Sequence, residues 1–171
     1  MPEKNDYVNY GSSGICRIED IRFMQFDSRR SGQDYYVLRP VYQEHANVFV
    51  PVNNPTLTAR MRPVLTPEEV DRVIYSVKGQ ELPWIADRKA RSARFREILL
   101  RRDEGELLLL IACLRKKDRE NSKGLSASDA QVLKLAEGMI QQEFSFSLNI
   151  SAQSIGSYIR SRLGSTESIG A

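Results

Sequence analysis

A chain of 171 residues is long enough for one ordinary domain or two small ones, and a hydrophobic content of 41% allows a buried core. A formal net charge of +3 does not by itself indicate a polyanionic partner, and two cysteines with a single histidine give neither a disulfide framework nor a zinc-ligand spacing. The longest apolar run, residues 107–114, is too short to cross a bilayer, so we expect no export and no membrane insertion.

The first 60 residues have the pattern of short strands. Aromatic and β-branched residues recur in four stretches, and turn residues at 11–14 and 28–32 supply hairpin connections. Asn53-Asn54-Pro55 ends the last stretch, because proline cannot donate to a strand ladder. These stretches predict four or five strands in a curled sheet or open β-barrel: residues 7–10, 15–21, 35–38 and 48–52.

After Arg62 the pattern becomes helical. Thr66-Pro67-Glu68-Glu69 places a capping hydroxyl, a first-turn proline and a glutamate at the third helical position. A linker near residues 79–84 follows, and we expect helix from about Trp84 or Ile85, a turn at 121–124, a helix start at Ser126 and a last one opened by Ser151. The prediction is an α+β protein, with a small β-rich domain over 1–64 and an all-α helical bundle over 65–171, and with a disordered tail after residue 164.

Sequence patterns that carry enzymatic chemistry are not found. There is no Gly-rich phosphate loop, nucleophile turn or His-Glu pair, and His45 has no titratable partner close in sequence. Cys16 and Cys113 are interpreted as reduced packing residues. We therefore expect no enzyme, no catalytic residue, no metal site and no cofactor.

The positive charge is concentrated in one segment. Residues 88–102 hold seven basic residues and only Glu97 on the acidic side, whereas residues 1–62 hold eight basic and seven acidic residues. If the helix begins near Trp84, the only tryptophan shares a face with Arg88 and Arg91, an arrangement that suits duplex DNA. A tryptophan covering a core and a solvated basic face explain the same pattern, as does docking on an acidic protein.

In the β-rich half, apolar side chains alternate at residues 21–24 and 48–50. An open edge strand there could accept a strand of another protein, although a private core produces the same alternation.

The order of these patterns resembles the CarD family, together with the corresponding domain of transcription-repair coupling factors. Asp6-Tyr7-Val8-Asn9-Tyr10 resembles the family's opening strand, Val48-Phe49-Val50-Pro51-Val52 resembles a later strand, and Met61-Arg62-Pro63-Val64 precedes the capped helix. Trp84-Ile85 and the Arg-rich helix resemble the helical module of clostridial-type members. The family's Tyr-Pro-x-His-Gly turn is replaced here by Tyr10-Gly11-Ser12-Ser13-Gly14, and the tryptophan is shifted by about one helical turn.

The resemblance implies a Tudor-like N-terminal domain that binds the β1 lobe of the RNA polymerase β subunit and a helical domain that contacts promoter DNA at the upstream edge of the bubble. Such a regulator modulates open-complex stability, reads little base sequence, and is expected to be a monomer in the cytoplasm and nucleoid. The alternative is an adaptor whose basic helical domain docks on an acidic protein surface. The implied polymerase-binding residues are Arg22, Met24, Val48 and Phe49, and the implied DNA-binding residues are Trp84, Arg88, Lys89, Arg91 and Arg94.

Overall fold

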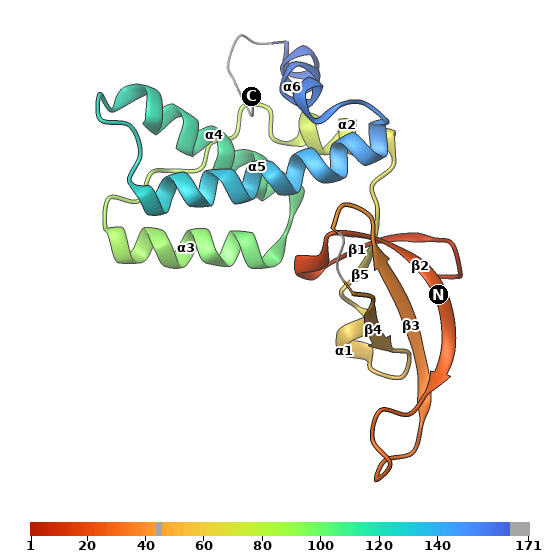
Figure 1. Ribbon diagram of the computed structural model, residues 1–171. Coiled ribbons are helices and arrows are strands. Elements are labelled where there is room, and N and C mark those ends of the chain that lie inside the picture. The colour runs from red at the N-terminus through yellow and green to blue at the C-terminus, as the bar shows by residue number, and fades with distance from the viewer. Residues whose placement is uncertain (44–45, 165–171) are drawn as a thin grey trace. The chain divides into compact units, whose positions relative to one another are not determined.

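The computed structural model describes residues 1–43 and 46–164 and is an α+β protein. The chain divides into two compact units, residues 1–64 and residues 65–171, the first built on a sheet and the second built from helices (Figure 1). His45 and the tail after residue 164, which the sequence predicted to be disordered, lie outside the described residues.

The first unit contains one five-stranded antiparallel sheet in the order β4-β3-β2-β1-β5. β4 and β5 are the edge strands, and the described residues form no β4–β5 pair that would close the sheet into a barrel. β2 and β3 extend beyond the predicted stretches, and the three-residue β5 was not predicted as a strand. The strands are β1 (Tyr7–Tyr10), β2 (Ile15–Met24), β3 (Gln33–Pro40), β4 (Val48–Pro51) and β5 (Met61–Pro63).

One face of this sheet carries a small core. Alternate residues along β2, β3 and β4, such as Ile18, Leu38 and Val50, are almost fully buried there, because successive side chains of a strand point to opposite faces. A short 3-10 helix η1 (Gly11–Ser13) joins β1 to β2, and the four-residue helix α1 (Pro55–Thr58) follows β4. Leu57 of α1 packs against the same core.

The second unit is helical. Its apolar stripes meet in one core. The helices α4 and α5 are the two longest of this unit and can be followed in Figure 1. Leu110, Leu114 and Phe144 are fully buried in it. The helices in the described part of this unit are α2 (Pro67–Ser76), α3 (Arg88–Arg101), α4 (Glu104–Glu120), α5 (Ala127–Leu148), the 3-10 helix η2 (Ala152–Ser154) and α6 (Ile155–Leu163).

The starts of these helices follow local capping chemistry. Thr66 and Glu69 form the complete capping box that the sequence predicted for α2. The prediction for α3 was wrong by about one turn. Asp87 is the N-cap, its carboxylate accepting a hydrogen bond from the Ala90 N–H at 2.8 Å, so α3 begins at Arg88 and Trp84 lies in the extended segment before it.

Both cysteines are free and buried, Cys16 in the sheet unit and Cys113 in α4, as the sequence predicted. Burial raises the pKa of Cys16 to about 11 and also raises the pKa of Cys113, so both thiols stay protonated near neutral pH. In the described part of the chain, no helix combines the length and the apolar character that crossing a membrane requires.

Candidate functional site

Three aromatic side chains gather on the face of the sheet that points away from its core. Phe26 follows β2, and its ring lies edge-on to Tyr35 of β3, with centroids 5.1 Å apart, and to Phe49 of β4, with centroids 5.5 Å apart. Phe26 and Phe49 are exposed, Phe26 at 61%. Exposed aromatic rings clustered beside an edge strand are typical of a protein-binding surface. When a partner binds, each ring buries a large apolar area and loses little conformational entropy.

The register of the strands brings three of the four predicted polymerase-binding residues to this face. Arg22 lies opposite Tyr35, and Phe49 lies opposite Val37, two residues further along β3 on the same face. Met24, two residues beyond Arg22, shares the face as well.

Val48, the fourth predicted residue, does not share this face. It lies opposite the buried Leu38 and packs against the core on the other side of the sheet, because neighbouring residues of a strand point to opposite faces.

Arg22 of this face is held by a local ion pair. Its Nη2 lies 3.0 Å from Asp20 Oδ2, and this hydrogen bond lowers the pKa of the Asp20 carboxyl. The pair is exposed, so a partner carboxylate can compete for the guanidinium.

The free edge of β4 offers one complete pairing position. The Val52 N–H donates to the Asp34 carbonyl at 2.9 Å, so Val50, two residues earlier, also directs its backbone groups toward β3. Phe49 and Pro51 therefore direct theirs outward, and proline has no N–H. Within β4, Phe49 is the residue that presents both a donor and an acceptor to an added strand.

In the helical unit, Trp84 lies at the margin of the core and is partly buried. Its ring lies edge-on to Phe95, with centroids 6.4 Å apart, and two cations lie over it: the Arg91 guanidinium at 4.5 Å and Lys117 Nζ at 5.0 Å from the ring centroid. Trp84 thus covers part of the core while keeping part of its ring at the surface.

Arg91 is withdrawn from the set of predicted DNA-binding residues. The side chain is buried, with 7% of the residue exposed, and its guanidinium forms two hydrogen bonds to the Asp129 carboxylate, at 3.3 and 3.1 Å. Nη1 donates to the carbonyl oxygens of Ile85 and Ala86, at 3.1 and 3.2 Å. A guanidinium occupied in this way has no free edge for a phosphate.

The other predicted cations of α3 differ in their surroundings. Arg94 lies within 3.3 Å of Glu97 and 3.6 Å of Glu106, which neutralise much of its charge. Arg88 and Lys89 are exposed, and neither has an ion-pair or hydrogen-bond partner for its side chain in the described part of the protein. The same holds for Arg96, seven residues after Lys89 and therefore on the same side of the helix.

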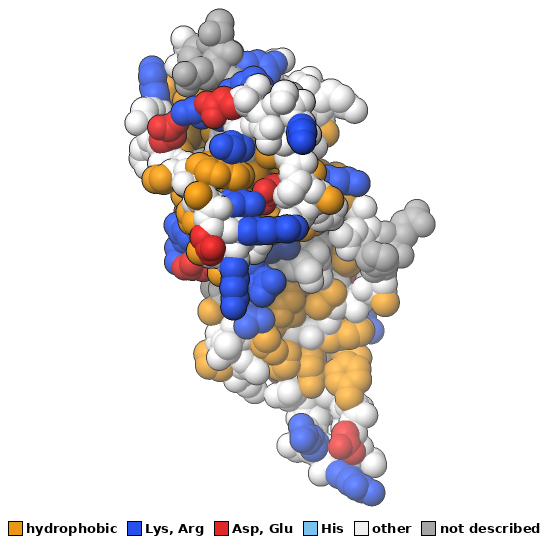
Figure 2. Space-filling view, turned by 90° about the vertical axis from the view of Figure 1, so that its left-hand side faces the viewer, with side chains coloured by type: hydrophobic (Ala, Val, Ile, Leu, Met, Phe, Trp, Pro, Cys, Tyr) orange, Lys and Arg blue, Asp and Glu red, His pale blue; other side chains and the backbone are white. Residues whose placement is uncertain are grey.

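Figure 2 faces the end of the helical unit where α3 and α5 begin and α4 ends, and Lys and Arg side chains gather there. Sequence reasoning missed Arg96, although its spacing from Lys89 was a usable signal. It also missed Phe26, Lys117 and Asp129, which gain their roles only through contacts with other elements.

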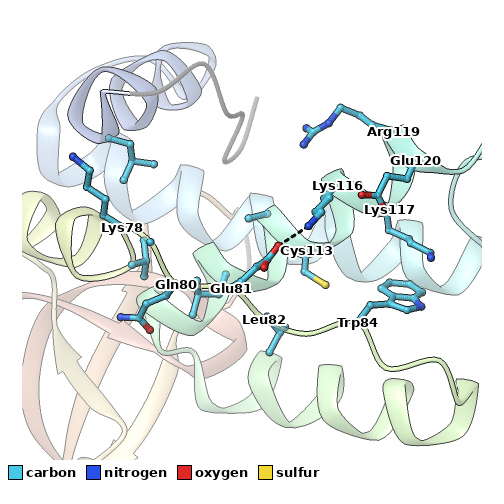
Figure 3. Close-up of a pocket in the computed structure, with 15 residues that line it drawn as sticks. Lys78, Gln80, Glu81, Leu82, Trp84, Cys113, Lys116, Lys117, Arg119 and Glu120 are labelled. Atoms are coloured by element: carbon cyan, nitrogen blue, oxygen red, sulfur yellow. Dashed lines mark hydrogen bonds and ion pairs between the residues drawn. The ribbon is translucent and has the colours of Figure 1, made fainter.

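A groove with a volume of about 910 Å³ runs between residues 77–84 and α4, and Trp84 lines one end of it (Figure 3). Lys116 and Glu81 face each other across it at 2.6 Å. Their hydrogen bond lowers the pKa of Glu81 and raises the pKa of Lys116, so both groups stay charged at neutral pH. Among the described residues, no group of three or more His, Cys, Asp or Glu side chains is placed to hold a metal ion.

Comparison with known proteins is informative for the sheet unit. Residues 3–65 match the family model of the CarD-like/TRCF RID domain, RID denoting an RNA polymerase-interacting domain, and these residues coincide with the unit that carries the five-stranded sheet. A search of curated proteins finds no match to the chain. Residues 3–65 of the chain are therefore a CarD-like RNA polymerase-interacting domain.

Proposed function

We propose that the chain is a transcription regulator that binds the β1 lobe of the RNA polymerase β subunit and contacts promoter DNA beside the melted region. The observation that carries the proposal is the RNA polymerase-interacting domain at residues 3–65, with an edge strand and an exposed aromatic cluster on it. In this proposal the open sheet is the Tudor-like fold of the family.

In this proposal the polymerase contact uses the edge strand β4. A strand of the β subunit adds to the sheet at Phe49, whose N–H and carbonyl point outward, and its side chains meet Phe26 and Tyr35. Arg22 and Met24, further along the same face, add polar and apolar contacts at the rim. The proposed contact is more aromatic than ionic.

The DNA contact is assigned to the exposed side of α3. Arg88, Lys89 and Arg96 carry charge that no carboxylate in the described residues neutralises, so phosphates can bind them with release of counterions. Trp84 is partly exposed in the segment before α3, from which its ring can press against a base step. Contacts of this kind position a protein on a duplex without reading its sequence.

The consequence is a shift in promoter populations. A factor that binds the open complex better than the closed complex favours the melted state by no more than its difference in affinity for the two. Promoters limited by opening are then activated, and promoters limited by polymerase escape are held back. No cofactor takes part in this scheme.

The polymerase contact is tested by measuring binding of the full chain to a β-subunit fragment that contains the β1 lobe. Phe49→Ser removes one exposed ring from the cluster and should weaken binding at least about tenfold, as truncation of a central aromatic residue does. Tyr75→Ser, which removes an exposed ring from α2, is the matched control and should leave binding unchanged. Equal affinity of all three proteins would refute the assignment of this face.

The adaptor alternative is kept because carboxylates interrupt the basic surface. Glu97 and Glu106 pair with Arg94 and Arg101, and Glu81 lies in the groove beside Trp84. A photoreactive residue at position 84, and separately at the exposed Leu100, in a complex of polymerase and promoter discriminates the two functions. Crosslinks to DNA support the regulator, and crosslinks to protein alone support the adaptor.

A further inference from the structure

We propose that Arg91 and Asp129 are positioning residues for Trp84: they hold the tryptophan in the orientation from which it meets DNA and do not touch DNA themselves. This inference rests on the DNA contact proposed above for Trp84. Arg91, which the sequence analysis assigned to DNA binding, is thereby reassigned to the residues that orient Trp84.

The Arg91 guanidinium contacts three kinds of partner. Nε and Nη2 donate to the two carboxylate oxygens of Asp129, Nη1 donates to the carbonyl oxygens of Ile85 and Ala86, and the guanidinium carbon lies over the Trp84 ring. The arginine therefore connects α3, the start of α5 and the residues that follow the tryptophan.

The segment it holds has no regular structure of its own. Residues 80–86 belong to neither helix nor strand, so the backbone beside Trp84 gains no orientation from a hydrogen-bond ladder. The carbonyl groups belong to the two residues directly after Trp84, and their hydrogen bonds to Arg91 fix the backbone that orients the tryptophan side chain.

Asp129 is itself held in place. The Ser126 hydroxyl donates to Asp129 Oδ2 at 2.9 Å and accepts from the Asp129 N–H at 3.2 Å at the start of α5. The chain of contacts thus runs from the cap of α5 through a buried ion pair to the tryptophan.

The buried Arg91–Asp129 pair is weak evidence for stability, because the desolvation of both charges offsets their attraction; in this proposal the pair serves geometry. Apolar side chains at positions 91 and 129 would fill the same space, but they would leave the carbonyl oxygens of Ile85 and Ala86 without a donor. Lysine would keep the charge, but a point charge cannot bond a carboxylate through two nitrogens and two carbonyl oxygens at once.

The test uses Trp84 as its own probe, because it is the only tryptophan of the chain. In the full-length variants Arg91→Lys and Asp129→Asn we expect a red shift of the tryptophan emission and a larger acrylamide quenching constant. The open-complex lifetime should fall to that of Trp84→Ala, and the double variant with Trp84→Ala should lose nothing further. In a third variant, Arg91→Gln, which removes the charge, the salt dependence of DNA association should stay that of the wild type, because no phosphate contact is removed.

Three results would overturn the proposal: unchanged emission and quenching in Arg91→Lys and Asp129→Asn, a double variant that loses more than Trp84→Ala alone, or a salt slope reduced by about one in Arg91→Gln. Far-ultraviolet circular dichroism and thermal unfolding verify folding. If both variants unfold, Ser126→Ala, which removes only the hydroxyl behind Asp129, should shift the emission in the same direction by less, and no shift would count against the proposal.

Failure of the proposed function is distinguishable from failure of this inference. If Trp84→Ala leaves the open-complex lifetime unchanged, the DNA role of Trp84 is wrong. The inference falls with it, even if emission and quenching show that Arg91 orders the ring.

Discussion

The unpaired cations of α3 make the DNA contact measurable through its salt dependence. Replacing Arg88, Lys89 and Arg96 together with alanine removes three charges that are exposed and have no partner among the described residues. Each lost phosphate contact lowers the slope of log affinity against log salt by about 0.9, so the triple variant should lose about 2.7 from the slope. Between 50 and 200 mM salt one contact corresponds to a factor of about 3.5, and three correspond to roughly 40-fold.

The assay is fluorescence anisotropy of a labelled promoter duplex with the full chain at several salt concentrations. The matched control replaces three other exposed cations without a described partner, Arg72, Lys78 and Lys134, so that both variants lose the same net charge. Both triple variants should unfold within about 1 kcal/mol of the wild type, because surface substitutions of this kind have small effects. Equal slopes for the two variants would refute the assignment of DNA contact to α3, since only total charge would then matter.

Three further predictions concern the fold. Phe144→Ala, in the core of the helical unit, should lower the free energy of unfolding by about 3–5 kcal/mol in a urea titration, and a loss below about 1 kcal/mol would contradict its full burial. Thr66→Ala removes the cap of α2 and should cost about 1 kcal/mol in the same titration, whereas a neutral result would mean that the box is redundant. The pKa of Cys16 rises from 9.0 in an open chain to about 11, which makes its ionisation roughly 100-fold less favourable at pH 8. Thiol alkylation should be slower by at least this factor in a Cys113→Ser background. The stabilisation tied to the protonated thiol is full below pH 9 and declines as pH rises through about 11, so this decline should vanish in Cys16→Ala.

Helix starts were predictable where the capping residue and its partner lie within one turn. Thr66 and Glu69 are three positions apart, and the structure contains the box they predict. The start of α3 was placed too early because the apolar and basic pattern around Trp84 suggested helix, whereas the competing signal was the single carboxylate of Asp87, which caps the helix at Arg88.

In the sheet, the local sequence pattern is not sufficient to predict every buried face and every strand. Alternation at residues 48–50 agrees with β4, where Val50 is buried and Phe49 is exposed, whereas β3 buries the consecutive residues Tyr36, Val37 and Leu38. β2 continues to Met24 with both faces largely exposed, and a register shift between Ile18 and Asp20 interrupts its alternation. The three-residue β5 is a strand only through its pairing with β1, and no feature of three residues indicates that pairing.

The candidate DNA surface illustrates the same limit for charged residues. Arg88 and Arg91 are identical in type and three positions apart, yet one is exposed and the other is buried against Asp129, 38 positions further along the chain. Counting charges along residues 88–102 therefore overstates what α3 presents to a phosphate. Because Arg91 shares the inward face with Phe95, the outward face of the helix is the one that carries Lys89 and Arg96, and DNA that contacts α3 must approach from there.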